Sequence, residues 1–167
     1  DAIRYNFEQM KKNIKEGTKI IAVIKADAYG HGAVPIARML EEFDYIWGFA
    51  AATAQEALQL RRAGITRPIL ILGLVFEEYY KKLAENDVRM AVCDYETARK
   101  FNKAAEAAGK KGLIHLAADT GMTRIGFKDS EESLEEIRRI AALPNVEIEG
   151  LFTHFARADE YDRTQIG

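Results

Sequence analysis

The sequence is poor in the residues that mark several common classes of protein. Its single cysteine, Cys93, cannot form a disulfide within the chain, which indicates a reducing, cytoplasmic setting. No apolar run approaches the roughly 20 residues that cross a bilayer. The 24 basic residues do not exceed the 26 acidic ones, so there is no surplus of positive charge to bind a nucleic acid. We therefore expect neither a membrane nor a nucleic acid as partner.

What the sequence does contain is a regular alternation of apolar runs and helical segments. With 167 residues, 48% of them hydrophobic, the chain is long enough to bury a core. Apolar runs of the length of a buried strand occupy residues 20–24, 46–51, 69–72, 88–92, 113–116 and 146–152. Continuous apolar strands indicate a parallel sheet covered on both faces. This predicts an α/β fold, either an open doubly wound sheet or an incomplete eight-stranded barrel.

Two of the intervening segments carry signals for the start of a helix. Thr53 and Glu56 form the T-x-x-E pattern of a capping box, and Gly64 ends the helix that follows. Asp129 and Glu132 are predicted to cap a later helix in the same way.

Parallel β/α folds place their active residues at the carboxyl ends of strands, and Lys25 closes the first apolar run. Partial desolvation there favours the neutral amine, which can attack an aldehyde. Tyr29 lies four residues later, and the glycine-rich segment 30–32 is expected to offer backbone N–H groups to an anion. The alternative is a lysine whose amine reaches solvent or pairs with Asp27.

Two familiar motifs match only in part. Gly30 and Gly32 begin a dinucleotide-binding fingerprint, but Pro35 occupies its third position. Residues 119–121 form the D-T-G tripeptide of aspartic proteases, whose chemistry needs a second carboxylate that no other D-T-G supplies. Neither class of protein is therefore favoured.

Arg124 and His154 follow the fifth and sixth apolar runs. A guanidinium fork suits a carboxylate or a phenolate, or else a surface acid. His154 is placed either to stack on a flat ring or to lie in the core as a hydrogen-bonded histidine. The histidines and Cys93 lack metal-ligand spacing, so we expect no metal. Together, the amine, guanidinium and imidazole suit an aldehyde cofactor with a stacked ring.

Three segments carry a resemblance to a known family. Residues 22–32, 119–127 and 151–156 resemble the signatures of alanine racemases, which use pyridoxal 5'-phosphate (PLP). The resemblance implies a TIM-type (β/α) barrel, of which residues 1–167 supply about six of eight strand–helix units. In that family a β-rich domain follows the barrel, and we expect it to be absent from this chain.

The resemblance also implies roles for particular residues. Lys25 would hold PLP through an imine and exchange the α-proton on the D-alanine side. Tyr29 would bind the cofactor phosphate, and His154 would lie against the pyridine ring. Arg124 would contact the phenolic oxygen of the cofactor and the substrate carboxylate. The implied activity interconverts L- and D-alanine and supplies D-alanine for peptidoglycan.

The chain departs from the family pattern in two ways. Ala117 stands where many members have a lysine that can be carbamylated and brace the arginine. The opposite-face base of the family is expected beyond Gly167, so the chain alone should bind PLP without racemising alanine. The family implies a homodimer in which the partner completes each active site. The alternatives are a racemase for another amino acid, such as serine, and a non-catalytic PLP-binding barrel.

Overall fold

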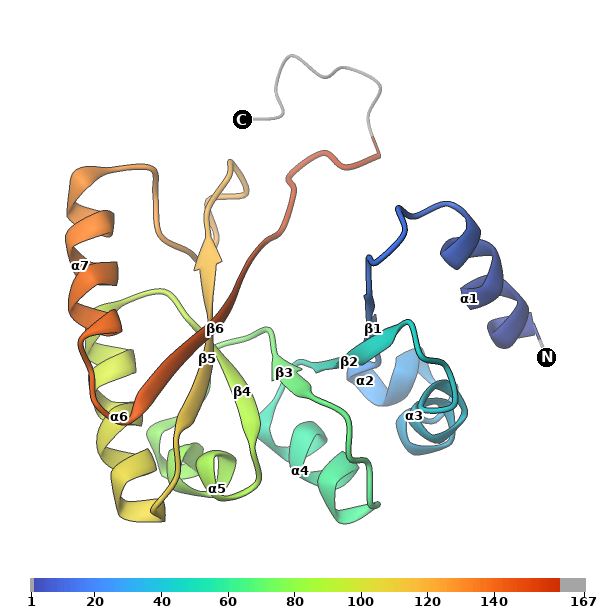
Figure 1. The fold of residues 1–167 in the computed structure, drawn as a ribbon, viewed down its shortest axis with the longest axis horizontal. Coiled ribbons are helices and arrows are strands. Elements are labelled where there is room, and N and C mark those ends of the chain that lie inside the picture. The colour runs from blue at the N-terminus through green and yellow to red at the C-terminus, as the bar shows by residue number, and fades with distance from the viewer. Residues whose placement is uncertain (1, 160–167) are drawn as a thin grey trace. The chain divides into compact units, whose positions relative to one another are not determined.

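A computed structural model describes residues 2–159 of the chain. Contacts divide the chain into two compact units, Asp1–Gly73 and Leu74–Gly167. Each unit is an α/β structure that contains three of the six strands (Figure 1). The α/β class and the six predicted strands are confirmed. Among residues 2–159, no helix is both long enough and apolar enough to cross a bilayer.

The N-terminal unit is built on three parallel strands that pair in chain order. The strands are β1 (Ile20–Val23), β2 (Ile46–Ala51) and β3 (Ile69–Ile71). The helices are α1 (Ala2–Lys12), α2 (Lys25–Tyr29), α3 (Ala33–Leu40) and α4 (Ala54–Arg62). None of the three strands contains a charged residue. Burial of apolar side chains such as Phe49 and Ile69 therefore stabilises this sheet.

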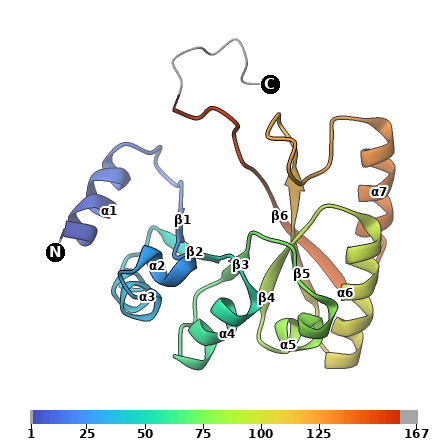
Figure 2. The same cartoon turned by 180° about the vertical axis from the view of Figure 1, so that it is seen from behind.

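The C-terminal unit has the same organisation, with parallel strands β4 (Val88–Val92), β5 (Gly112–Ala118) and β6 (Val146–Thr153). Its helical segments are η1 (Glu77–Tyr79), α5 (Tyr80–Glu85), α6 (Tyr95–Ala108) and α7 (Glu131–Ala141). Figures 1 and 2 show α5, α6 and α7 on one face of this three-stranded sheet.

Close packing between α6 and β5 defines which side chains face the helices. A Cβ at Gly112 would lie 2.7 Å from the ring of Phe101 on α6. Because side chains alternate along a strand, Ile114 faces the helices as Gly112 does, and His115 faces the opposite side of the sheet. The sheet face away from the helices therefore carries the polar side chain of His115. Residues 113–116 were interpreted from the sequence as an apolar run, so this polar position was not predicted.

The predicted element boundaries are accurate at the strands and less so at one helix. β2 and β4 have the predicted bounds; β1, β3 and β6 differ by one residue at one end, and β5 begins one residue earlier and ends two residues later than predicted. Thr53 caps α4 as predicted, because its Oγ1 accepts a hydrogen bond from the Glu56 N–H at 3.3 Å. The predicted cap at Asp129 is wrong. Ser130 has the extended backbone of a cap residue, and its Oγ accepts from the Ser133 N–H at 3.2 Å.

Candidate active site

Lys25 lies at the carboxyl edge of the N-terminal sheet. The Ile24 N–H donates to the Ala50 carbonyl at 2.9 Å, so the ladder between β1 and β2 continues up to the residue before Lys25. The Lys25 side chain starts from a half-buried position, and no ion pair involves it among residues 2–159. Lys25 therefore follows directly on the end of the ladder between β1 and β2, as the sequence predicted for this position.

The turn that follows Lys25 is left-handed. Ala26, Asp27 and Ala28 have φ of 51°, and Tyr29 has φ of 55°. Crowding between Cβ and the carbonyl oxygen disfavours this conformation in L-residues, and such strain is concentrated at functional sites. This turn was not predictable from the residues, since alanine and tyrosine rarely adopt positive φ.

The N–H groups of the glycine-rich segment 30–32 are already bonded. Gly30 and Gly32 donate to the Asp27 carbonyl at 3.1 and 2.9 Å, and His31 donates to the Ala28 carbonyl at 3.2 Å. The prediction that these groups are free for an anion is therefore wrong, because the left-handed turn uses them. Tyr29 is 64% exposed, which leaves its side chain accessible at the same turn.

Two carboxylates fix this turn. Asp27 Oδ1 accepts a hydrogen bond from the Ala33 N–H at 2.7 Å, at the start of α3, so its carboxylate is engaged there. Glu56, in the first turn of α4, accepts from the Ala26 N–H at 3.0 Å and from the Ala52 N–H at 2.8 Å. The turn is thereby joined to the end of β2 and to α4.

Arg124 lies on an exposed loop after β5 in the C-terminal unit. Asp119 Oδ1 accepts from the N–H groups of Thr123 at 2.8 Å and Gly121 at 3.1 Å. These two donors, Thr123 first, lower the pKa of the Asp119 carboxyl. The loop closes where the Phe127 N–H donates to the Ala117 carbonyl at 2.8 Å. Arg124 itself makes no ion pair within the described residues.

The loop that carries Arg124 is tied to the segment that carries His154. The hydroxyls of Thr120 and Thr153 are 2.7 Å apart, and Thr153 is the last residue of β6. His154 follows directly and is exposed, so the alternative of a core histidine is wrong for this residue. The buried histidine is His115, which is 7% exposed.

An ionic cluster crosses the C-terminal sheet. Arg89 on β4 donates from Nε and Nη2 to the two carboxylate oxygens of Glu149 on β6, at 2.9 and 2.8 Å. His115 Nε2 lies 3.0 Å from Glu149 Oε2. Hydrogen bonding by Arg89 is the main cause that lowers the pKa of the Glu149 carboxyl. We call these three residues the strand cluster; sequence reasoning missed it, because the partners are 60 and 34 residues apart.

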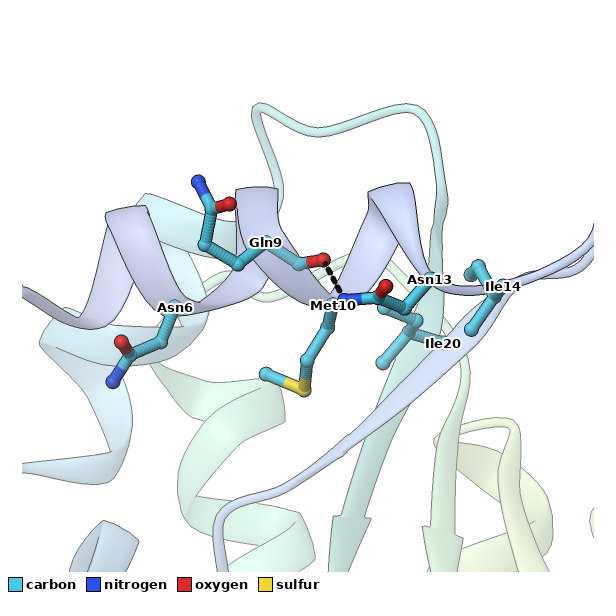
Figure 3. Close-up of a pocket in the computed structure, with 6 residues that line it drawn as sticks. All are labelled: Asn6, Gln9, Met10, Asn13, Ile14 and Ile20. Carbon is cyan, nitrogen blue, oxygen red and sulfur yellow. Dashed lines mark hydrogen bonds between the residues drawn. The ribbon is translucent and has the colours of Figure 1, made fainter.

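Three other features were considered as candidate sites: metal-ligand groups, the thiol of Cys93 and a groove beside α1. No group of three or more His, Cys, Asp or Glu side chains is placed to hold a metal ion within residues 2–159. Cys93 is a free thiol after β4, and burial raises its pKa. A groove of about 560 Å³ beside α1 has only amide and apolar side chains, namely Asn6, Gln9, Met10, Asn13, Ile14 and Ile20 (Figure 3). Because it lacks a charged or nucleophilic group, this groove is not the candidate site.

Each unit offers side chains that suit part of an aldehyde cofactor with a phosphate. Lys25 supplies a primary amine and Tyr29 a phenol hydroxyl on one turn of the N-terminal unit. In the C-terminal unit, Arg124 supplies a guanidinium and His154 an imidazole, both exposed at the carboxyl ends of strands. An amine can bind the aldehyde covalently, and the other groups suit oxyanions and a flat ring.

Comparison with known proteins identifies the family of this chain. The family model described as "Alanine racemase, N-terminal domain" matches residues 1–166. The chain belongs to this family. The alanine racemase of Clostridium tetani is 44% identical over 164 residues, which are 98% of this chain and 42% of that protein. The chain thus spans less than half the length of the curated relatives it matches.

Solved structures confirm the fold of the alanine racemase N-terminal domain. The alanine racemase of Clostridium difficile 630 is 44% identical, with a TM-score of 0.93 over 97% of this chain and 42% of that one. A histidine racemase from Leuconostoc mesenteroides is 31% identical, with a TM-score of 0.85 over 97% of this chain and 43% of that one. The chain therefore has the fold of an incomplete TIM-type barrel with six parallel strands, and the open doubly wound sheet is excluded.

Proposed function

We propose that this chain is the barrel portion of a PLP-dependent racemase that interconverts L- and D-alanine. The observation that carries the proposal is the half-buried residue Lys25 directly after β1, on a turn that donates a backbone N–H to Glu56 and whose Asp27 bonds to the start of α3. Membership of the alanine racemase family supports alanine as substrate and PLP as cofactor. Supply of D-alanine for peptidoglycan in the cytoplasm is part of the same proposal.

The residues of this chain have distinct proposed roles. Lys25 holds the cofactor through its amine and moves a proton to or from the substrate α-carbon on the D-alanine side. Tyr29 donates its hydroxyl to the cofactor phosphate, and His154 packs against the ring. Arg124 orients the substrate carboxylate and contacts the phenolic oxygen of the cofactor. When bound, PLP supplies the electron sink that makes the α-proton acidic enough to remove.

Racemisation needs a base on each face of the α-carbon, and Lys25 serves only one of them. We propose that the second base comes from the part of the enzyme outside these residues, contributed by the partner subunit of a homodimer. The chain alone should then bind PLP at Lys25 without racemising alanine. The relatives, of which it covers about 42%, are long enough to include such a further portion.

The direct test is borohydride reduction of the PLP-loaded full-length protein, followed by peptide mapping. We expect the pyridoxyl group on Lys25. An adduct on a different lysine would overturn the assignment. Loss of the adduct in a Lys25→Ala variant, with retained folding, provides the control.

A second candidate is racemisation of another amino acid. The similarity to a histidine racemase, at 31% identity, shows that relatives with this half of the fold are not all named for alanine. Initial rates on L-alanine, L-serine and L-histidine separate the two candidates. A protein that forms the Lys25 adduct but turns over none of them would be the non-catalytic PLP-binding barrel.

A further inference from the structure

Glu56 makes an unusual pair of bonds for a residue in a capping box. In a capping box the Glu accepts from the N–H of the cap residue, here Thr53. Glu56 accepts with one oxygen from the N–H of Ala52, the residue before that cap, at 2.8 Å. Its second oxygen, however, accepts from the Ala26 N–H at 3.0 Å, 30 residues earlier in the chain. One carboxylate therefore joins the ends of β1 and β2 to the start of α4.

The Ala26 N–H belongs to the residue directly after Lys25, where the left-handed turn begins. Ala26 has φ of 51°, and the next three residues have the same sign. Without a partner at this N–H, the peptide plane between Lys25 and Ala26 is freer to rotate toward ordinary φ values. A change of the dihedral angles on either side of that plane turns Lys25 relative to the rest of the turn, and the Lys25 side chain moves with its Cα.

We propose that Glu56 is a positioning residue for Lys25, which fixes the direction of the amine by holding the Ala26 N–H. The bond is charge-assisted, and both carboxylate oxygens of Glu56 are engaged by backbone donors. The role of Glu56 in catalysis rests on the proposed function, whereas its effect on the turn does not.

The chain offers a matched control in Glu41. Its Oε1 accepts from the backbone N–H groups of Thr66 at 2.8 Å and Arg67 at 3.1 Å. These residues precede β3, at the amino edge of the same sheet, whereas Lys25 follows the carboxyl end of β1. E41Q therefore makes the same chemical change as E56Q in the same unit, away from the Lys25 turn.

The first experiment measures amide hydrogen exchange in the full-length protein without PLP. The Gln side chain of E56Q has one acceptor oxygen and one NH₂ group, so either the Ala26 N–H or the Ala52 N–H loses its acceptor. We expect the exchange rate of that amide to rise about tenfold or more. In E56A both amides should exchange faster. E41Q should raise exchange at Thr66 and Arg67 and leave Ala26 unchanged. If E56A does not fold, E56Q still decides the question.

The second experiment measures the PLP-loaded protein. We expect E56Q to shift the pH at which the absorbance of the lysine-bound cofactor changes and to lower kcat about tenfold or more with a smaller change in KM, since misplacement by about 1 Å is costly. E41Q should match the wild type in both. Unchanged exchange at both Ala26 and Ala52 in E56Q together with an unchanged absorbance titration, or unchanged exchange at Ala26 in a folded E56A variant, would overturn the proposal.

The two proposals fail in distinguishable ways. If the wild type forms no adduct at Lys25, the proposed function fails, while the exchange data still report whether Glu56 holds the turn. If the wild type forms the adduct and racemises alanine but E56Q has wild-type exchange, absorbance and kcat, only the role of Glu56 is rejected.

Discussion

The two units hold their candidate active-site loops in different ways. In each, a single carboxylate accepts hydrogen bonds from two backbone N–H groups. Asp119 bonds to residues two and four positions later in its own loop. Glu56 bonds across elements, to Ala26 and Ala52. The Arg124 loop is thus braced from within, whereas the Lys25 turn depends on the correct placement of α4.

The two sheets differ as well. Strands β1–β3 contain no charged residue, whereas β4–β6 carry the strand cluster of Arg89, His115 and Glu149. The side chains of Arg89 and His115 are 12% and 8% exposed. Such groups are costly to bury unless they are paired. We therefore expect the C-terminal sheet to depend on the Arg89–Glu149 pair, and the N-terminal sheet to depend on apolar packing.

The largest effect is expected when the strand cluster is broken. Arg89→Met leaves Glu149 without its bidentate partner in a partly buried place, and we expect it to cost about 3 to 4 kcal/mol in the free energy of unfolding. Urea-induced unfolding measures this loss. A loss below about 1 kcal/mol would show that the cluster is dispensable and would remove the difference between the two sheets.

Arg99→Met is the matched control. Arg99 also makes a bidentate pair, with Glu96 at 2.8 and 2.7 Å, but on the exposed surface of α6. Exposed pairs contribute little, so this variant should unfold like the wild type.

The folded-state pKa of Glu149 is lowered, so its contribution to stability is present above the usual glutamate pKa and is lost as the pH falls through the lowered value. The difference in the free energy of unfolding between Arg89→Met and the wild type should therefore become smaller in acid.

A smaller loss of stability is expected when a methyl group is added at Gly126, where the Arg124 loop closes against the Asp119 backbone. Gly126 has φ of 127°, and a Cβ there would lie 2.6 Å from the Asp119 backbone nitrogen. Gly121 has φ of 118°, but nothing lies within 4 Å of its Cβ position. Gly121→Ala should cost about 1 to 2 kcal/mol from backbone strain alone, and Gly126→Ala about 1 kcal/mol more, because the backbone must also move. Equal losses in urea unfolding would show that the loop tolerates the close approach.

Features that depend on residues close together in the sequence were predictable, and contacts between distant residues were not. The strands were predictable because each is a continuous apolar run, and Thr53 and Glu56 were predictable as a local capping pattern. The bond from Glu56 to Ala26 and the strand cluster join residues far apart in the chain. Only the folded arrangement brings such partners together.

The positive φ values after Lys25 were missed for a related reason. Intrinsic preference places alanine and tyrosine at negative φ, so the turn is stable only because tertiary contacts override that preference. Ser130 was missed as a cap for a simpler reason. Asp129 and Ser130 are both good cap residues, and the choice between them is a shift of one position.

The smallest effect is expected at Asp119, where bracing is local and exposed. Asp119→Asn keeps an acceptor oxygen but removes its charge, so the N–H groups of Thr123 and Gly121 should exchange faster at neutral pH. The folded-state pKa of Asp119 is lowered, so the wild-type advantage is present above the usual aspartate pKa and is lost as the pH falls through the lowered value. Amide exchange at pH 7 and pH 3, compared between the variant and the wild type at each pH, tests this. Faster exchange along β5 in the variant would contradict this prediction, because loss of hydrogen bonds within the loop should speed exchange only in that loop.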